Sequence, residues 1–482
     1  MANRFIKLLI FICLPTILIL GITQYQSNSS DKVIIEGMVG QPRHLNPVQI
    51  SDNVVDRDLV NILYRSLFKY DELGFLVSDL AGSYEVSEDG LTYTVHLNDN
   101  QTFDDGVKIT TNDVIFTASK LTGIKDVKIE KQDDLTVKFI LTQAYYGFPE
   151  LLTFPVAAEH LGLEQKPLSK FISSTGFYVS AIDPAPNHIE SITMRRREFS
   201  KDNVNTIIFK FYNDRDELKT ALELGEIDLY AGSEISWPHF DEHSTVLNGV
   251  DYAIYFNLNH TGVWTDLDNR KILAAHIPKE KIATQILENR YQLLNGPLSG
   301  EFARTIDPYP YTTEASSLSG KINLVVPRTE DNLKVADVIK SEWEALGLEI
   351  QLKIVDPDDL DDKIMARRDF DAILLGHEVS HDPDRYNYLH SAQVTYPGLN
   401  ISGYKQVRVD KAIEKGRQEK DPVKRREQYT LFQDSIIDDV PAIYLYQPRY
   451  SIFARDNIEG INLGVLYYPS ERYRSLPQWS KN

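Results

Sequence analysis

A run of five residues in the C-terminal half carries side chains that could bind a metal ion and activate water. Residues 377–381, His-Glu-Val-Ser-His, match H-E-x-x-H, in which two histidines one helical turn apart bind zinc and the glutamate is the general base. That chemistry needs a helix, whereas the apolar residues 372–375 indicate a strand and Pro383 follows closely. The motif leaves open a secreted zinc metallohydrolase, or a binding role for His377 and His381 towards a metal chelate or an anionic solute.

Other catalytic patterns are missing from the sequence. It contains no G-x-S-x-G nucleophile elbow, no phosphate-binding P-loop and no G-x-G-x-x-G turn. The one cysteine, Cys13, lies in an apolar segment near the N-terminus, so the rest of the chain can form no disulfide, thiolate metal site or cysteine nucleophile. We therefore expect a protein that is not an enzyme and needs no cofactor.

The charge balance argues against a nucleic-acid partner. The chain has 70 Asp plus Glu against 51 Lys plus Arg, a formal net charge of −19, and such a surface repels phosphates. Its 482 residues are enough for two or three domains.

The N-terminus has the pattern of an export signal. Arg4 and Lys7 precede the apolar run 8–22, and the polar residues 25–31 follow it. The run is shorter than the roughly 20 residues of a full membrane span, and no clear cleavage site follows it. A cleaved signal and an uncleaved anchor both stay open. In either case the rest of the chain is expected to work outside the cytoplasm, in the periplasm or at the cell surface.

Strands alternate with helices from Val33 onward. Residues 91–97 alternate apolar and polar side chains, and residues 134–141 have the same period, so the two segments could pair. Thr110 and Asp113 have the spacing of a capping box, which predicts a helix start.

The third quarter of the chain gives the clearest prediction of fold class. Residues 321–326 and 349–355 indicate strands, and the helix between them has apolar residues on one face and stops at Gly347. Strands joined by a crossover helix pair in parallel, so the architecture is predicted to be α/β. Further expected elements are a strand at 371–376, a helix opening at Asp421-Pro422 and a strand at 441–446.

An ordered set of segments resembles the peptide/nickel class of ABC-importer solute-binding proteins, which includes dipeptide and oligopeptide receptors. The most specific segment is 80–121, including Asp105-Gly106 and Asp113-Val114. In the segment 174–178, Phe177 stands at a position where the family usually has proline. The other segments are QPRHLNP (41–47), NILYRSLFKYDELG (61–74), STGFY (174–178), ALELGEIDLY (221–230), YFNLN (255–259), NGPL (295–298) and VPAIYLYQP (440–448).

The resemblance implies a two-lobed, periplasmic-binding-protein-like α/β fold of the large type, with an extra subdomain and a hinge near Leu258 and Tyr446. It also implies the function: an extracytoplasmic, monomeric component of an ABC importer, which binds a peptide or similar small solute between its lobes and delivers it to the permease. The implied division is 1–30 signal or anchor, 31–55 with 181–257 and 446–482 lobe I, 56–180 lobe I subdomain, and 258–445 lobe II.

The ligand site expected from the resemblance departs from the family in one position. Peptide-binding members use an acidic residue to pair with the ligand's α-amino group, and that position holds Val379 here. An ammonium buried against valine would cost several kcal/mol. Either Glu378 or Asp382 takes the role, or the ligand is not an ordinary peptide. The remaining candidates for ligand binding are Gln41, His44, Asn257, Asn259, His377 and Tyr386.

Overall fold

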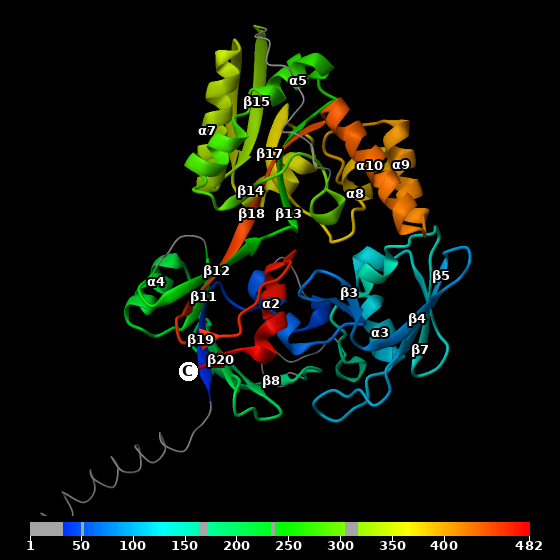
Figure 1. Cartoon of the computed structure of the whole chain (residues 1–482), viewed down its shortest axis with the longest axis vertical. Coiled ribbons are helices and arrows are strands. Elements are labelled where there is room, and N and C mark those ends of the chain that lie inside the picture. Colours follow the sequence, from blue (N-terminus) through cyan, green and yellow to red (C-terminus); the bar gives the residue numbers. More distant parts are fainter. Residues whose placement is uncertain (1–31, 50–52, 163–171, 233–236, 304–316) are drawn as a thin grey trace, which may run out of the picture.

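The computed structural model describes residues 32–49, 53–162, 172–232, 237–303 and 317–482, which form two lobes, one above the other in Figure 1. The predicted export segment and Cys13 lie outside the described residues. Within the described ranges, no helix has the length and apolar character needed to cross a membrane.

Lobe I contains the elements β1 (Val33–Val39), α2 (Val54–Leu63), β8 (Phe177–Pro184), β9 (Ile189–Arg196), β10 (Thr206–Tyr212), α4 (Arg215–Glu223), β11 (Leu229–Ala231), β12 (Phe240–Val246), β19 (Ile458–Glu459) and β20 (Ser480–Lys481). β1 is parallel to β10 on one side and to β11 on the other. The 3-10 helix Pro469–Gln478 packs with α2. Ile34 and Met38 of β1 are buried at the centre of the lobe, with the charged Glu36 buried between them.

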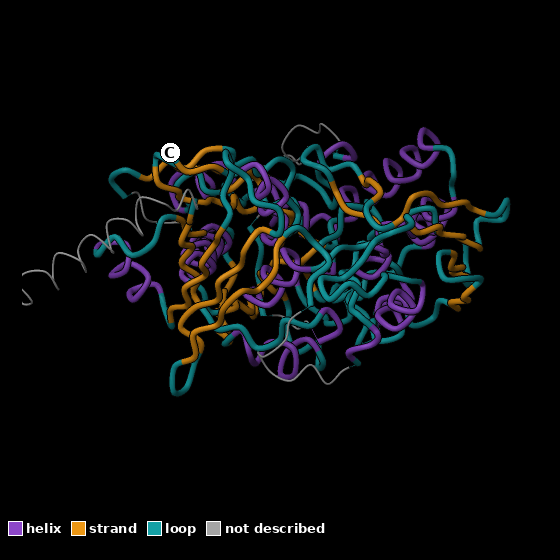
Figure 2. The backbone as a smooth tube through the Cα atoms, turned by 90° about the horizontal axis from the view of Figure 1, so that it is seen from below, coloured by secondary structure: helices purple, strands orange, loops and turns teal. Residues whose placement is uncertain are grey.

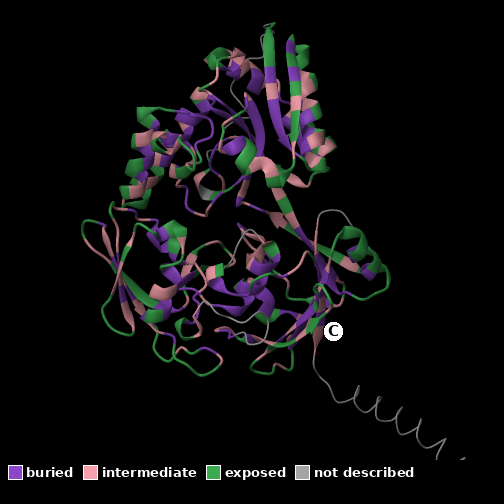
Figure 3. Cartoon of the chain, turned by 180° about the vertical axis from the view of Figure 1, so that it is seen from behind, coloured by how far each residue is buried: buried purple, intermediate pink, exposed green. Residues whose placement is uncertain are grey.

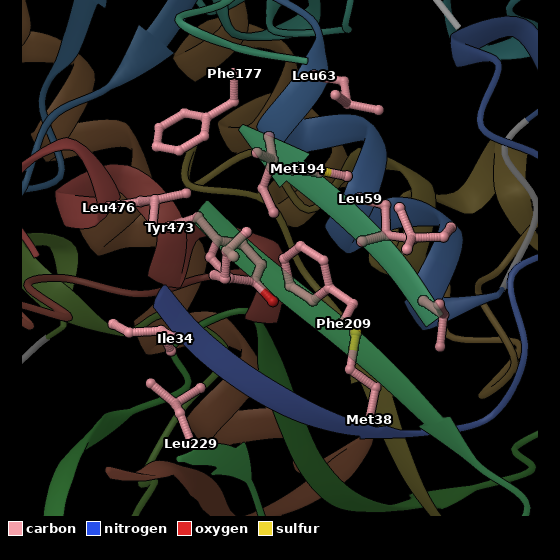
Figure 4. Close-up of a cluster of buried hydrophobic side chains, with 14 of the residues drawn as sticks. Ile34, Met38, Leu59, Leu63, Phe177, Met194, Phe209, Leu229, Tyr473 and Leu476 are labelled. Atoms are coloured by element: carbon pink, nitrogen blue, oxygen red, sulfur yellow. The ribbon is translucent and has the colours of Figure 1, made fainter. Parts of the chain in front are cut away.

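One hydrophobic core joins α2, the sheet and the C-terminal helix of lobe I. Leu59 and Leu63 are fully buried, and Figure 4 shows them on the α2 side of the sheet with Phe209 of β10. Tyr473 and Leu476 complete the cluster from the C-terminal helix, about 410 residues further along the chain. Because one face of α2 packs into this core, its opposite, exposed face is turned towards the other lobe.

The subdomain contains β2 (Phe68–Tyr70), β3 (Leu76–Ser78), β4 (Ala81–Val86), β5 (Thr92–Leu97), α3 (Thr111–Ala118), β6 (Lys128–Lys131) and β7 (Thr136–Ile140). Its four-stranded sheet has the order β4-β5-β7-β6, and Figure 2 shows these strands apart from the large sheet, at the opposite end of the view. β5 pairs with β7 in antiparallel register, which confirms the predicted pairing. The capping box of Thr110 and Asp113 is also confirmed.

Lobe II contains β13 (Val250–Phe256), α5 (Leu267–Ala275), α6 (Lys279–Lys281), β14 (Tyr291–Leu293), β15 (Gly320–Pro327), α7 (Glu330–Ala345), β16 (Leu348–Val355), β17 (Ala372–Glu378), α8 (Tyr386–Leu389), α9 (Val407–Gln418), α10 (Pro422–Asp439) and the start of β18 (Ala442–Arg455). β15 is parallel to β16 and to β17, as the crossover helix α7 predicts. Gly347 follows α7 with φ +98°, a conformation that glycine adopts at little cost. In Figure 3 buried residues follow these strands through the core of the lobe.

The strand β18 runs through both lobes, and it is visible in Figure 1 between α10 and β12. Its first half pairs with β13, and its second half pairs with β11 and β12. β13 in turn pairs with β17 along its whole length, whereas the resemblance to the family implies that residues 250–256 belong to lobe I. The other connection between the lobes is the short turn 247–249 between β12 and β13. The two lobes are therefore joined at closely spaced points.

Candidate functional site

A cavity of about 1090 Å³ lies between the two lobes. Lobe I and its subdomain contribute most of the wall, from α2, residues 64–70, 150–155, 174–177 and the C-terminal segment 467–477. Lobe II contributes Val250 at the start of β13, Glu378 at the end of β17, and Ser380 and His381 just after that strand. The volume lies just above the range of roughly 300–1,000 Å³ for small-molecule sites. The cavity has room for a ligand larger than a single amino acid.

The helix α2 presents Arg57 and Asn61 to this cavity because the two residues are one turn apart on the face opposite the buried leucines. Asn53 caps the helix by accepting the backbone N–H of Asp56. Arg57 Nη1 reaches across the cavity to Glu378 Oε1 of lobe II at 3.2 Å. Both side chains are partly exposed, so this ion pair contributes at most about 1 kcal/mol to lobe contact.

His381 of lobe II is inserted between two tyrosines of lobe I and its subdomain. Its ring stacks on Tyr70 at a centroid distance of 3.3 Å and on Tyr467 at 3.7 Å. Its Nε2 lies 3.0 Å from Glu471 Oε1. Burial lowers the pKa of His381, and the nearby Glu471 carboxylate only partly opposes that shift. An uncharged imidazole that donates to Glu471 therefore bridges the lobes.

Glu150 forms a second contact between the subdomain and lobe II. The Tyr70 hydroxyl and the backbone of Asp382 lie close enough to the Glu150 carboxyl group to influence its pKa. Nearby, a Cβ atom on Gly147 would lie 2.5 Å from Asp382 Oδ2, so the close approach of the two chains needs glycine. Burial, and then the charge of Asp382, raise the pKa of Glu150 to about 8.

The sequence profile of the bacterial extracellular solute-binding proteins, family 5, matches residues 76–397. That match covers more than half of the chain. The chain belongs to this family.

Relatives of this family 5 protein have the same architecture at low sequence identity. The oligopeptide-binding protein AppA of Bacillus subtilis is 23% identical over 92% of this chain and 91% of its own length. The structure of AppA with a nonapeptide gives a TM-score of 0.72 at 21% identity, covering 94% of this chain and 99% of AppA. The ABC transporter substrate-binding protein CtaP of Listeria monocytogenes gives 0.78 at 22% identity, covering 94% and 100%. The predicted two-lobed α/β fold is confirmed.

In this family 5 protein the H-E-x-x-H residues do not form a zinc site. The motif needs a helix, but β17 ends at Glu378 and no helix includes His381. The His377 ring lies in the core of lobe II against Tyr255 at 4.6 Å and Tyr388 at 5.0 Å, and burial lowers its pKa to about 4. No group of three or more metal-binding side chains occurs in the described part of the chain. The described residues therefore give the metallohydrolase alternative no support.

Of the ligand-binding candidates in residues 377–386, only Glu378 lines the cavity. Val379 is buried and its backbone N–H donates to Gly249 O at 2.8 Å. Asp382 is buried in an ion pair with Arg425, and Tyr386 packs under Arg417, whose guanidinium lies 4.5 Å from the ring centroid. 

The four remaining candidates lie outside the cavity wall. Gln41 accepts the backbone N–H of Ile189, and His44 is exposed. Asn257 is buried, where its side chain donates to the carbonyls of Arg368 and Phe370. Asn259 is exposed and donates its backbone N–H to the Asn257 side chain. That these four residues contact the ligand remains a prediction.

Sequence reasoning missed most of the residues that meet in the cavity. Tyr70, Glu150 and the pair Tyr467 and Glu471 come from three segments far apart in the chain. Tyr70 lies in the segment 61–74, which indicated the family but no ligand contact, and the other three lie in no segment that the sequence analysis named. The density of tyrosine in residues 467–473 was the one available signal, since aromatic side chains are common in ligand sites.

Proposed function

We propose that this protein is the receptor component of an ABC importer and that it binds a short peptide in the cavity between its lobes. The observation that carries the proposal is the cavity itself, which both lobes line and which is large enough for several residues. The relatives named as oligopeptide-binding proteins support the same ligand class. The protein acts as a monomer outside the cytoplasm, held there or sent there by its N-terminal segment, and it delivers the solute to a membrane permease.

The proposed mechanism is a hinged closure of lobe II onto lobe I. We place the hinge at the turn 247–249 and at the middle of β18, near residues 447–449, because the strand partners change there. A ligand that contacts both walls binds the closed form more tightly, and this difference in affinity drives closure. The permease would then recognise the closed surface.

The chemistry of the wall suits a zwitterionic, partly apolar solute. Tyrosine rings at positions 70, 467 and 468 offer apolar faces with hydroxyl groups at their edges. Arg57 on one side and Glu378 on the other offer opposite charges, and a ligand with both charges could replace their mutual contact. A peptide has these features in one molecule.

The proposal is tested by thermal unfolding of the purified protein after bound solute has been removed by unfolding and refolding. Tri- to nonapeptides at about 100-fold above Kd should stabilise the fold by about 2.7 kcal/mol, which is a rise of several degrees in melting temperature. Tyr467→Ala should weaken binding about tenfold, because it removes a ring from the cavity wall. Tyr396→Ala, at an exposed tyrosine of lobe II outside the wall, is the matched control. A peptide library that shifts no melting temperature contradicts the proposal.

A further inference from the structure

His381 of lobe II fills a narrow slot between two tyrosine rings that belong to the opposite side of the cavity. The Tyr70 ring lies at a centroid distance of 3.3 Å and an interplanar angle of 5° from the imidazole, and the Tyr467 ring at 3.7 Å and 23°. Both tyrosines are in van der Waals contact with the imidazole, so the slot admits one flat ring. All three residues line the cavity, and the slot therefore opens onto the space that the ligand enters.

The two walls of this slot are held to each other without help from lobe II. Asp71 and Glu72 follow Tyr70 directly, and both are hydrogen-bonded to the C-terminal segment. The backbone N–H of Val465 donates to Glu72 O at 2.9 Å. Arg474 Nη1 donates to Asp71 O at 2.8 Å and to Val465 O at 2.9 Å. We therefore expect the slot to keep its width when lobe II moves away.

A hydrogen-bond acceptor at the end of the slot is also positioned without lobe II. Glu471 Oε2 accepts the backbone N–H groups of Tyr467 at 2.8 Å and Tyr468 at 3.2 Å. The same oxygen forms an ion pair with Arg474 Nη2 at 2.5 Å. Glu471 Oε1 is directed to the slot, where it lies 3.0 Å from His381 Nε2. The acceptor thus stays in place for another N–H group when His381 leaves.

Opening of the lobes withdraws His381 from the slot, because its backbone belongs to the segment that follows β17 of lobe II. Two tyrosine faces and one carboxylate oxygen are then open to the cavity before lobe II returns. Binding sites for small molecules combine aromatic walls with a few placed polar groups, and the vacated slot has both features.

We propose that this slot is a subsite for a flat, nitrogen-bearing ring of the ligand, such as the imidazole of a histidine side chain, and that His381 occupies the subsite in the ligand-free protein. The inference rests on the proposed function and adds a side-chain preference to its substrate class. The ligand ring stacks on Tyr70 and Tyr467 and donates its N–H to Glu471 Oε1. His381 then stays outside the slot, so lobe II closes with its segment 379–382 in a different position.

The first test compares alanine tripeptides that contain one histidine with tripeptides that contain one leucine at the same position, for each of the three positions. Calorimetry at pH 7.5 keeps the imidazole largely uncharged. At one position or more, histidine should give about tenfold tighter binding to the wild type than leucine, because leucine has no flat faces to stack on two rings. Tyr467→Leu should reduce this preference to within about threefold. Tyr396→Leu, at an exposed tyrosine outside the wall, should retain it.

A second measurement asks whether His381 and a free ring compete for the slot. Ligand-observed NMR at pH 8 gives the affinity for imidazole alone. His381→Ala should bind imidazole about tenfold more tightly than the wild type, because its slot is empty without any opening of the lobes. His239→Ala, at an exposed histidine outside the wall, should bind imidazole like the wild type. This comparison does not use Tyr467→Leu, so it survives poor folding of that variant.

The outcomes separate the inference from the function on which it rests. Equal binding of histidine and leucine peptides at every position, or a histidine preference that Tyr467→Leu retains, overturns the inference and leaves the peptide receptor intact. Equal affinity of the wild type and His381→Ala for imidazole also overturns the inference. Absence of binding by every peptide of both series overturns the proposed function and the inference with it.

Discussion

Arg472 lies beneath the cavity floor between two buried carboxylates. Its guanidinium donates to Glu36 Oε1 at 2.9 Å and to Asp58 Oδ2 at 2.8 Å, and it is 1% exposed. Glu36 is in the middle of β1, and Asp58 is on α2, so one side chain from the C-terminal segment joins three elements. The Tyr473 hydroxyl also donates to Glu36. At this scale, a single cation holds the floor of the cavity in place.

Replacement of this cation is predicted to be severely destabilising. Arg472→Met leaves two carboxylates buried without a counter-charge, which should lower the free energy of unfolding by about 3–5 kcal/mol. Urea denaturation followed by circular dichroism measures the change. Arg367→Met, at an exposed arginine of lobe II, should stay within about 0.5 kcal/mol of the wild type. Similar values for the two variants would mean that the buried ion pairs contribute little.

At the scale of elements, the start of α3 connects local sequence to the packing of the subdomain. Thr110 and Asp113 form a reciprocal cap at the first turn of the helix. Asp113 has a second role, because its Oδ1 accepts the backbone N–H of Glu159 at 2.9 Å. The cap that the sequence predicts is therefore also a contact between α3 and the segment that leads away from the cavity wall.

The two residues of the cap should differ in their effect on stability. Thr110→Ala removes one side-chain acceptor and should cost about 1 kcal/mol of unfolding free energy. Asp113→Ala leaves two backbone donors without their acceptor at a site that is 4% exposed, and should cost about 2–3 kcal/mol. Chemical denaturation of both variants measures the difference. Equal costs would mean that the contact with Glu159 adds nothing to the cap.

At the scale of the whole molecule, the lobes meet through contacts that respond differently to pH. The stack of His381 between Tyr70 and Tyr467 needs an uncharged imidazole, which prevails above pH 6.5 because burial lowers the pKa of His381. Glu150 opposite Asp382 has a pKa raised to about 8 in this structure, where the subdomain and lobe II are in contact. Since opening exposes Glu150 to water, closure and protonation of this carboxyl group are linked.

The ligand-free protein is predicted to open as pH rises from 6.5 to 8. An acid whose pKa is higher in the closed form than in the open form binds more protons when closed, so its stabilising effect is lost as pH rises through about 8. Over this range closure should weaken by about 2 kcal/mol, at 1.36 kcal/mol for each pH unit. Small-angle scattering should show an increase in the radius of gyration.

The variant Glu150→Gln tests whether Glu150, and not another titratable group between the lobes, causes the change in the radius of gyration. It cannot lose a proton, so its radius of gyration should stay constant over the same pH range. Glu159→Gln should behave like the wild type, since that residue is exposed in the closed form. A wild-type radius that does not change with pH would show that Glu150 has the same surroundings in both forms.

The sequence by itself determined the local elements. Residues 91–97 and 134–141 became the paired strands β5 and β7, and the segment 321–355 became two parallel strands with a crossover helix. The reason is that burial of one face imposes a period of two on a strand and of 3.6 on a helix, and this period can be read directly. Resemblance added the family and its two-lobed fold, which the family match confirms.

Only the tertiary structure decided which residues line the cavity. Tyr70, Glu150, His381 and Tyr467 meet there although up to almost 400 positions separate them in the chain. The extent of β18 was also hidden, since its apolar pattern predicted a strand that ended at residue 446, whereas pairing with β11 and β12 extends it to Arg455. Contacts between distant segments depend on which elements pack against one another. The period of an element shows that one of its faces is buried but not which distant element covers that face.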